Sequence, residues 1–278
     1  MPVMLKAALP MVPGVNQIPG IKKAGGALPD ITRERHRVAI DAAHVASYAQ
    51  VCGFESSDFL PLTYIHMLAF PLHMEIMTSA DFPFPAIGTV HLRNKIHQLR
   101  KVRSSEVLDI TVTATNLRPH AKGKVFDMNA RATSDSERVW ESTSTYLRLG
   151  KGDTSAPAEG ESFEVVPAGP ITWSLPDNLG RRYGAVSGDM NPIHLYPLTA
   201  KALGFKRQIA HGMWTKARCV AAIATRLGDE ATVEVEFKKP IFLPSKVAFG
   251  SRVLGVGELD FAVINPRNQA PHLVGRAR

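Results

Sequence analysis

The chain has 278 residues, of which 45% are hydrophobic and 21% are charged, a balance typical of a globular protein with a sizeable core. Its two cysteines, Cys52 and Cys219, indicate no disulfide framework and favour a reducing, cytoplasmic setting. The net charge of +8 is spread over short groups without a nucleic-acid motif, which argues against nucleic acid and fits an anionic small molecule.

The first residues do not have the pattern of an export signal or of a membrane span. The apolar start is interrupted by Lys6 and followed at once by Pro10 and Pro13, whereas a signal peptide needs a longer apolar region. No apolar run approaches the ~18 residues that a membrane span requires. We therefore expect a cytoplasmic protein that does not associate with a membrane.

Hydrophobic periodicity predicts a helix followed by consecutive strands in each half of the chain. In the first half, the predicted elements are a helix over Leu68–Met77 and strands over Val90–Ile96, Val107–Leu117, Val125–Ala132 and Glu137–Leu147. In the second half, they are a helix over Gly212–Leu227 and strands over Thr232–Phe237, Lys246–Leu254 and Leu259–Ile264. Long helices before runs of strands favour an α+β fold with an antiparallel sheet.

A segment rich in Gly, Ser, Pro and acidic residues divides the chain. We expect an N-terminal unit over 1–150, a linker over 151–170 and a C-terminal unit over 171–278. The two units show a faint repeat, because ungapped alignment places Tyr48 on Tyr183, Gly53 on Gly188 and Phe54 on Asp189. Each unit is therefore expected to run strand, helix, loop, long helix and further strands.

The pattern with most chemical content is Y-G-A-V-S-G-D-M-N-P-I-H, ending at His194, with A-H-G-M following at Ala210. An isolated G-D-x-N-P is usually only a turn. Because His194 and the later H-G-M are also present, the combined pattern favours a catalytic site over a simple turn. Pro192 restricts the turn so that Asp189 and His194 can hold one water between a carboxylate and an imidazole.

This motif resembles the signature of the MaoC-like dehydratase family, also called the hydratase 2 type. The resemblance covers the second half by motif and the first half only through the repeat. It implies a tandem, or double, hot-dog fold, in which each unit is a long central helix wrapped by an antiparallel sheet. It also implies that the motif half is catalytic and that the other half helps to form the acyl pocket.

The implied activity is reversible hydration of trans-2-enoyl thioesters to (R)-3-hydroxyacyl thioesters, a hydro-lyase reaction. Asp189 and His194 would act on the water, and the backbone N–H of Gly212 at a helix N-terminus would receive the enolate oxygen. Residues expected to brace the site or contact substrate are Ser187, Asn191, His211, Phe54, Leu68 and Phe70. His211 is more readily explained as a structural residue, and Phe54, which replaces the acid, as lining for an apolar chain.

Other functions and partners stay open at this stage. The substrate would be an acyl-coenzyme A or acyl-carrier-protein thioester, with no cofactor beyond coenzyme A as part of the substrate. No spacing of Cys or His predicts a metal site. An acyl-thioester hydrolase, a carrier-bound hydroxyacyl dehydratase and a non-catalytic thioester-binding module are the alternatives. Both a self-sufficient monomer and a homodimer paired through sheet edges remain compatible with the sequence.

Overall fold

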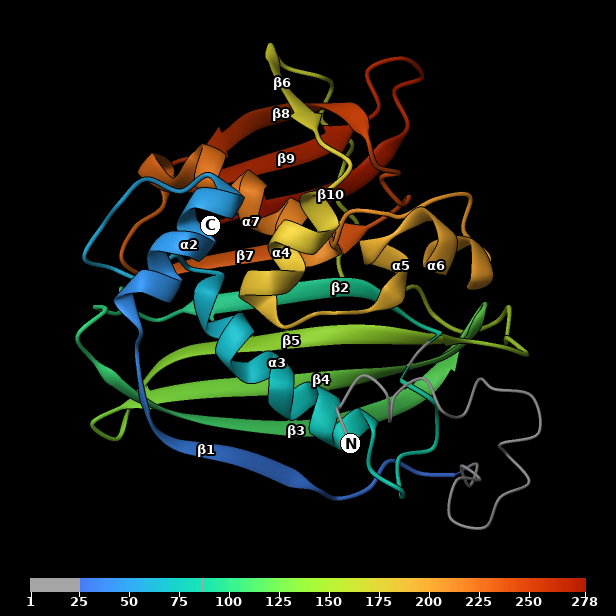
Figure 1. The fold of residues 1–278 in the computed structure, drawn as a ribbon, viewed down its shortest axis with the longest axis horizontal. Helices are drawn as coiled ribbons and strands as arrows, with labels where there is room; N and C mark the ends of the chain where they lie inside the picture. The colour runs from blue at the N-terminus through green and yellow to red at the C-terminus, as the bar shows by residue number, and fades with distance from the viewer. Residues whose placement is uncertain (1–25, 87) are drawn as a thin grey trace.

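The computed structural model describes residues 26–86 and 88–278, which build one antiparallel sheet with its helices on one side (Figure 1). The strands are β1 (Thr32–Ala39), β2 (Thr89–Gln98), β3 (Val107–His120), β4 (Gly123–Ser134), β5 (Glu137–Leu149), β6 (Ile171–Leu175), β7 (Ala231–Phe237), β8 (Ser245–Gly255), β9 (Glu258–Ile264) and β10 (Pro271–Ala277). The helices are α2 (Ala42–Cys52), α3 (Tyr64–Met77), α4 (Leu179–Ser187), α5 (Pro192–Leu195), α6 (Pro197–Ala202) and α7 (Gly212–Ile223), followed by the 3₁₀ turn η3 (Ala224–Arg226).

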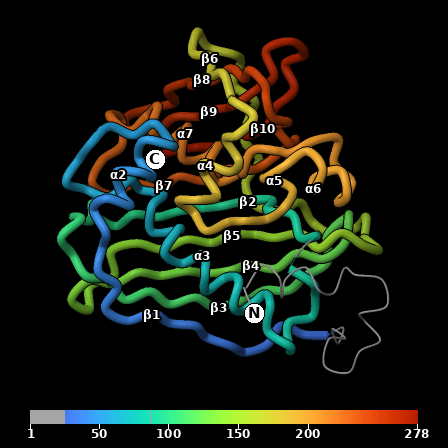
Figure 2. The backbone as a smooth tube through the Cα atoms, in the orientation of Figure 1, coloured from blue at the N-terminus to red at the C-terminus, as the bar shows by residue number. Residues whose placement is uncertain are grey.

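The sheet is symmetric in its strand order, which runs β1-β3-β4-β5-β2-β7-β10-β9-β8-β6. Counted from either outer edge, each half contributes its first, third, fourth, fifth and second strand. The halves join where β2 pairs antiparallel with β7, from Arg93 opposite Glu236 to Gln98 opposite Ala231 (Figure 2). A helix wrapped by an antiparallel sheet, present twice, confirms the predicted α+β tandem hot-dog fold.

The ends of α2 and α4 show the repeat most clearly. Gly53 and Gly188 cap these helices in the left-handed region, with φ of 78° and 72°, which glycine adopts without steric cost. Tyr48 and Tyr183, one turn earlier, are buried with ring centroids 6.2 Å apart. The two short helices therefore pack together through the residues that the sequence alignment equates.

Some boundaries and one strand differ from the sequence prediction. Helix α3 begins at Tyr64 rather than Leu68, and α7 ends at Ile223, with η3 carrying the chain towards Leu227. Strand β10 was not predicted, because its sequence P-H-L-V-G-R-A combines Pro, Gly and charge in a short run. It nevertheless lies in the middle of the second half, between β7 and β9.

The segment 151–170 has no helix or strand but is packed rather than loose. Phe163 and Val166 are buried against the sheet face opposite the helices, with Ala248, Ala262, Ile264 and Val274. The guanidinium of Arg93 on β2 donates to the carbonyls of Glu159 at 2.8 Å and Glu161 at 2.5 Å. These contacts fix the connecting segment against the back of the sheet.

None of the helices in the described ranges is long and apolar enough to cross a membrane. The buried apolar residues of α2, α3, α4 and α7 belong largely to one apolar core. That core draws on both halves, so the sheet and its helices form one packed body.

A buried lysine joins α7 to both central strands. Lys216 is 0% exposed, and its ammonium donates to the Asn94 carbonyl at 3.0 Å, the Asn94 Oδ1 at 2.5 Å and the Val233 carbonyl at 2.8 Å. All three of its donor hydrogens are therefore used. Asn94 lies on β2 and Val233 on β7, so one side chain connects the second half's helix to the junction between the halves.

Replacing Lys216 with methionine is expected to destabilise the protein by about 2–4 kcal/mol, because buried acceptors lose their donor without access to water. Denaturant unfolding measures the change. Lys95→Met, at an exposed lysine of β2, is the matched control and should stay within about 0.5 kcal/mol of the parent. Equal stability of the two variants would contradict the anchoring role of Lys216.

Candidate active site

Local hydrogen bonds hold the loop that carries Asp189. The Asp189 backbone N–H donates to the Ser187 hydroxyl at 3.1 Å, and the Asp189 Oδ1 accepts from the Asn191 N–H at 3.1 Å. The Asn191 side chain in turn accepts from the Ile193 N–H at 3.3 Å and so caps α5, whose first residue is Pro192. This chain of short-range contacts turns the backbone between α4 and α5 and fixes Asp189 relative to His194.

His194 is buried, and its ring orientation is set by the backbone. Its Nδ1 lies 2.8 Å from the carbonyl oxygen of Ile209, which can only accept. The proton is therefore assigned to Nδ1, and Nε2 carries the lone pair. Burial lowers the pKa of His194, against the opposing influence of Asp189 and of the Ile209 hydrogen bond. The side chain is thus a neutral imidazole with a basic nitrogen.

His211 supports the other two groups. Its Nε2 lies 3.0 Å from the backbone carbonyl oxygen of Asp189 and 3.8 Å from the Asp189 carboxylate. Its ring stacks on that of His194 with centroids 3.7 Å apart. Burial and the neighbouring His194 hold the pKa of His211 well below its usual value, so it is neutral as well. These contacts favour a positioning role for His211.

Gly212 begins α7, where the first N–H groups of a helix lack intrahelical acceptors. In the described part of the chain, the Gly212 N–H makes no hydrogen bond to protein. A Cβ at this position would lie 3.0 Å from Cε1 of Phe237. The missing side chain therefore leaves the N–H open to a ligand atom, with the helix dipole behind it.

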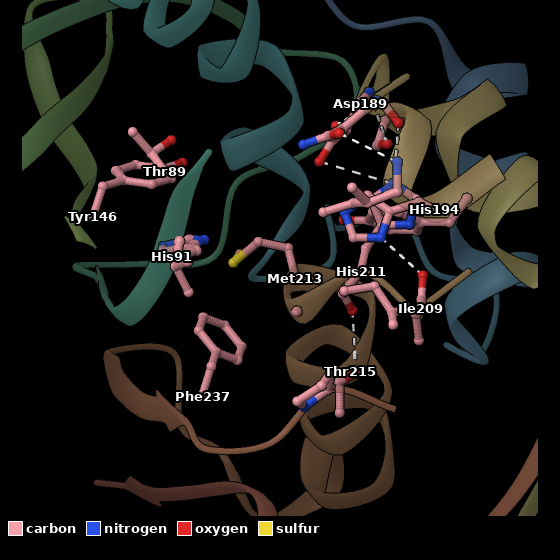
Figure 3. Close-up of a pocket in the computed structure, with 18 of the residues that line it drawn as sticks. Thr89, His91, Tyr146, Asp189, His194, Ile209, His211, Met213, Thr215 and Phe237 are labelled. Carbon is pink, nitrogen blue, oxygen red and sulfur yellow. Dashed lines mark hydrogen bonds and ion pairs between the residues drawn. The ribbon is translucent and has the colours of Figure 1, made fainter. Parts of the chain in front are cut away.

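These groups face a cavity of about 520 Å³ (Figure 3). The second half contributes Asp189, His194, Gly212 and their supports to one wall. The opposite wall comes from the first half: Met67, Phe70, Met74 and Met77 of α3, Thr89, Val90 and His91 of β2, and Tyr146 of β5. The carboxylate and the paired imidazoles of the cavity thus come from the second half, while both halves contribute apolar lining.

The structure brings together most of the site residues predicted from the sequence. The cavity is lined by Ser187, Asp189, Asn191, His194, His211, Gly212 and Phe70, but not by Phe54 or Leu68. Phe54 stacks on Tyr48 and lines a different hollow of about 380 Å³. Leu68 packs against the core on another side of α3 from Met67 and Phe70. The structure therefore does not bring Phe54 and Leu68 to the cavity that contains Asp189 and His194.

Several cavity residues were not predicted as part of the site. Tyr146 and Phe237 come from strands whose alternation shows only that they face the core. His66 and His91 belong to no motif in the sequence and lie in the half without the Asp189–His194 pattern. Their positions in the cavity depend on how α3 and β2 face the second half, a relation that no local pattern encodes.

Asp189, His194 and His211 are the described groups best placed to share a ligand. Each offers an atom within 4.8 Å of those of the other two, which is also a geometry for a metal ion. One nitrogen of each imidazole is already committed to a backbone carbonyl. His194 Nε2 and the Asp189 carboxylate remain as an acceptor pair suited to the hydrogens of one water molecule.

Comparison with known proteins identifies relatives of the chain. A family model described as a MaoC-like domain matches residues 155–269. The chain is 34% identical over 274 residues to 3-hydroxyacyl-thioester dehydratase X of Mycobacterium tuberculosis, covering 98% of this chain and 94% of the relative. The HtdX crystal structure from the same organism superposes with a TM-score of 0.79 at 33% identity, over 89% of this chain and 99% of that one.

More distant structures support the fold alone. A MaoC-like dehydratase from Phytophthora capsici has a TM-score of 0.74 at 19% identity, covering 90% of this chain and 95% of its own. The near-complete match to a relative at 34% identity, together with the domain match over residues 155–269, is decisive for the family. The chain belongs to the MaoC-like dehydratase family.

Proposed function

We propose that this protein is a hydro-lyase that interconverts trans-2-enoyl thioesters and (R)-3-hydroxyacyl thioesters. The observation that carries the proposal is the meeting of three groups at one cavity: the Asp189 carboxylate, the basic Nε2 of His194 and the unoccupied N–H of Gly212. The 3-hydroxyacyl-thioester dehydratase to which the chain is 34% identical supports the same reaction.

Each group has one task in the hydration direction. His194 Nε2 accepts a proton from water while the Asp189 carboxylate holds the other hydrogen. The water oxygen bonds to the β-carbon, and the π electrons move to the thioester oxygen, where the Gly212 N–H stabilises the enolate. Return of the proton to the α-carbon completes the addition, and the reverse sequence releases water. Delivery from one face gives syn addition.

We also propose a division of labour between the halves, with 1–150 as the acyl-pocket unit and 171–278 as the catalytic unit. The apolar wall from α3 supports this assignment, since Met67, Phe70, Met74 and Met77 give a flexible lining for an alkyl chain. Lys239 is exposed where it lines the cavity and supplies positive charge for the phosphates of coenzyme A or of a carrier protein's phosphopantetheine.

Thioester hydrolysis is the second candidate, because acyl-carrier-protein thioesterases are among the structural neighbours. The thioesterase from Umbellularia californica has a TM-score of 0.56 at 10% identity, a likeness of fold alone. A hydrolase of this fold would place its carboxylate on or near the central helix. Helix α7 carries no Asp or Glu, and Glu75 of α3 is exposed and outside the cavity. The site therefore favours hydration.

Asp189→Asn and His194→Gln are each expected to lower kcat/KM for crotonyl-coenzyme A hydration by ~10²-fold or more, because each removes one partner of the reacting water. The loss of enone absorbance measures the rate. The double variant should be little worse than either single variant, since both groups act on one step. Near-parent turnover in a single variant would remove that residue from the mechanism, and thiol release without hydration would favour the hydrolase.

The pH profile of kcat/KM should report the neutral His194. Because burial lowers its pKa from the ordinary 6.5, the basic form persists below that pH and activity is lost only as pH falls further through the lowered value. The acid limb is therefore expected below pH 6.5, and it should disappear from the residual activity of His194→Gln. An acid limb centred above 6.5 would contradict a neutral, buried imidazole as the base.

Phe70 and Leu68 provide a matched pair for testing the acyl pocket. Phe70→Ala should shift the ratio of kcat/KM between long and short enoyl thioesters, by ~0.8 kcal/mol for each methylene whose burial changes. Leu68→Ala, on the same helix but outside the cavity, should leave the ratio as in the parent. If both variants keep the parent ratio, the acyl tail does not lie against α3.

A further inference from the structure

Three buried histidines of the first half form a contiguous group beside the cavity. His66 and His73 lie on α3 with ring centroids 5.4 Å apart, and His91 on β2 lies 6.3 Å from His66. His66 and His91 line the cavity, whereas His73 lies behind them. We call His66, His73 and His91 the histidine group. None of them has a role in the hydration reaction described above.

The histidine group is short of hydrogen-bond partners. In the described part of the chain, His66 Nδ1, both nitrogens of His73 and His91 Nε2 are buried without an acceptor or donor. His66 is 1% exposed and His73 is 0% exposed. Leaving such atoms unpaired is unfavourable for the fold, so a ligand that supplies hydrogen-bond partners beside them would be stabilised.

The charge state of the group limits what it can bind. Burial lowers the pKa of His73 and of His91 to about 3 and that of His66 well below its usual value. Each neutral imidazole offers one N–H and one lone pair. The nearby Lys216 ammonium is already saturated by three protein acceptors, so it provides no free cation for an anion. A neutral oxygen function, hydroxyl or carbonyl, is the complementary ligand.

The location of His91 links the group to the reacting end of the cavity. The Phe237 ring lies against the Cβ position of Gly212, with Cε1 at 3.0 Å, and its centroid is 5.0 Å from that of His91 (Figure 3). His91 is therefore one aromatic ring away from the N–H assigned to the thioester oxygen. The remaining wall around it, from Met67 to Met77 on α3, is apolar.

We propose that the acyl chain of the preferred substrate carries a neutral oxygen function that hydrogen-bonds to His66 and His91. The site would thus act on oxygenated acyl thioesters in preference to plain alkyl ones. This inference rests on the proposed hydration activity and narrows its substrate class. It also explains why a mainly apolar wall contains two imidazoles, where methionine or leucine would serve an alkyl tail.

The experiment compares binding of saturated, unreactive coenzyme A thioesters by calorimetry. The probes are hexanoyl, octanoyl and decanoyl thioesters, each with and without a terminal hydroxyl. The three chain lengths place the hydroxyl at three distances from the thioester group. The wild-type protein is expected to bind at least one hydroxylated probe about threefold to tenfold more tightly than the probe of the same chain length without the hydroxyl. This is the gain in affinity expected from one hydrogen bond. Absence of any preference overturns the proposal without requiring a variant.

Variants locate the preference. His66→Leu and His91→Leu should each abolish most of it, while His73→Leu, in the same group but outside the cavity, should keep the wild-type ratio of affinities. If the preference survives both cavity variants, the oxygen binds elsewhere. If both variants weaken all probes equally, the histidines contact the pantetheine arm, which every probe shares, and the proposal fails.

A separate assay keeps the two proposals apart. Hydration of crotonyl-coenzyme A, which has no distal oxygen, tests the reaction alone. If the wild-type protein hydrates this substrate but shows no binding preference for the hydroxylated probes, only the inference about the acyl chain is contradicted. No turnover of crotonyl-coenzyme A, or of longer trans-2-enoyl-coenzyme A thioesters with and without a terminal hydroxyl, would instead overturn the proposed function on which the inference rests.

Discussion

The pairing of β2 with β7 is the contact on which the rest of the structure depends. It joins two sets of strands into one sheet, and it sets α3 and α7 against a shared surface with one wall of the cavity on each. Lys216 reinforces this junction because its buried ammonium has no water to compensate it and needs acceptors from both strands. A slip of the pairing would remove those acceptors and separate the catalytic wall from the acyl wall.

The two halves kept a common frame while their side chains diverged. Asp189, in the turn after α4, is matched in the first half by Phe54, in the turn after α2. His194 lies five residues after Asp189, and the residue five positions after Phe54 is Phe59. Phe54 and Phe59 line the smaller hollow, where Arg103 lies 4.7 Å over the Phe59 ring. A carboxylate and an imidazole can activate water, and two phenyl rings cannot. The structure thus has two hollows, and the proposed function assigns the hydration chemistry to the one that Asp189 and His194 line.

The sequence predicted the features that local interactions determine. The loop from Ser187 to His194 is held by hydrogen bonds between residues close in the chain, so its motif could be interpreted without the fold. Features set by long-range packing were missed. Strand β10 has a weak local signal and exists because β7 and β9 supply partners on both sides. Phe54 was assigned to the acyl pocket from the repeat alone, but the repeat relates it to the other hollow.

The burial of two stacked imidazoles explains why a carboxylate accompanies them. With ring centroids 3.7 Å apart, His194 and His211 cannot both carry a proton without strong repulsion, and burial already favours their neutral forms. In the proposed mechanism His194 takes a proton from water, and the resulting buried positive charge requires a negatively charged neighbour because burial disfavours it. Asp189 supplies that partner, since its charge favours the protonated form of His194. In the proposed mechanism the carboxylate thus serves the transient imidazolium as well as the water, whereas a neutral amide at the same position could accept a hydrogen from water but would not stabilise the imidazolium.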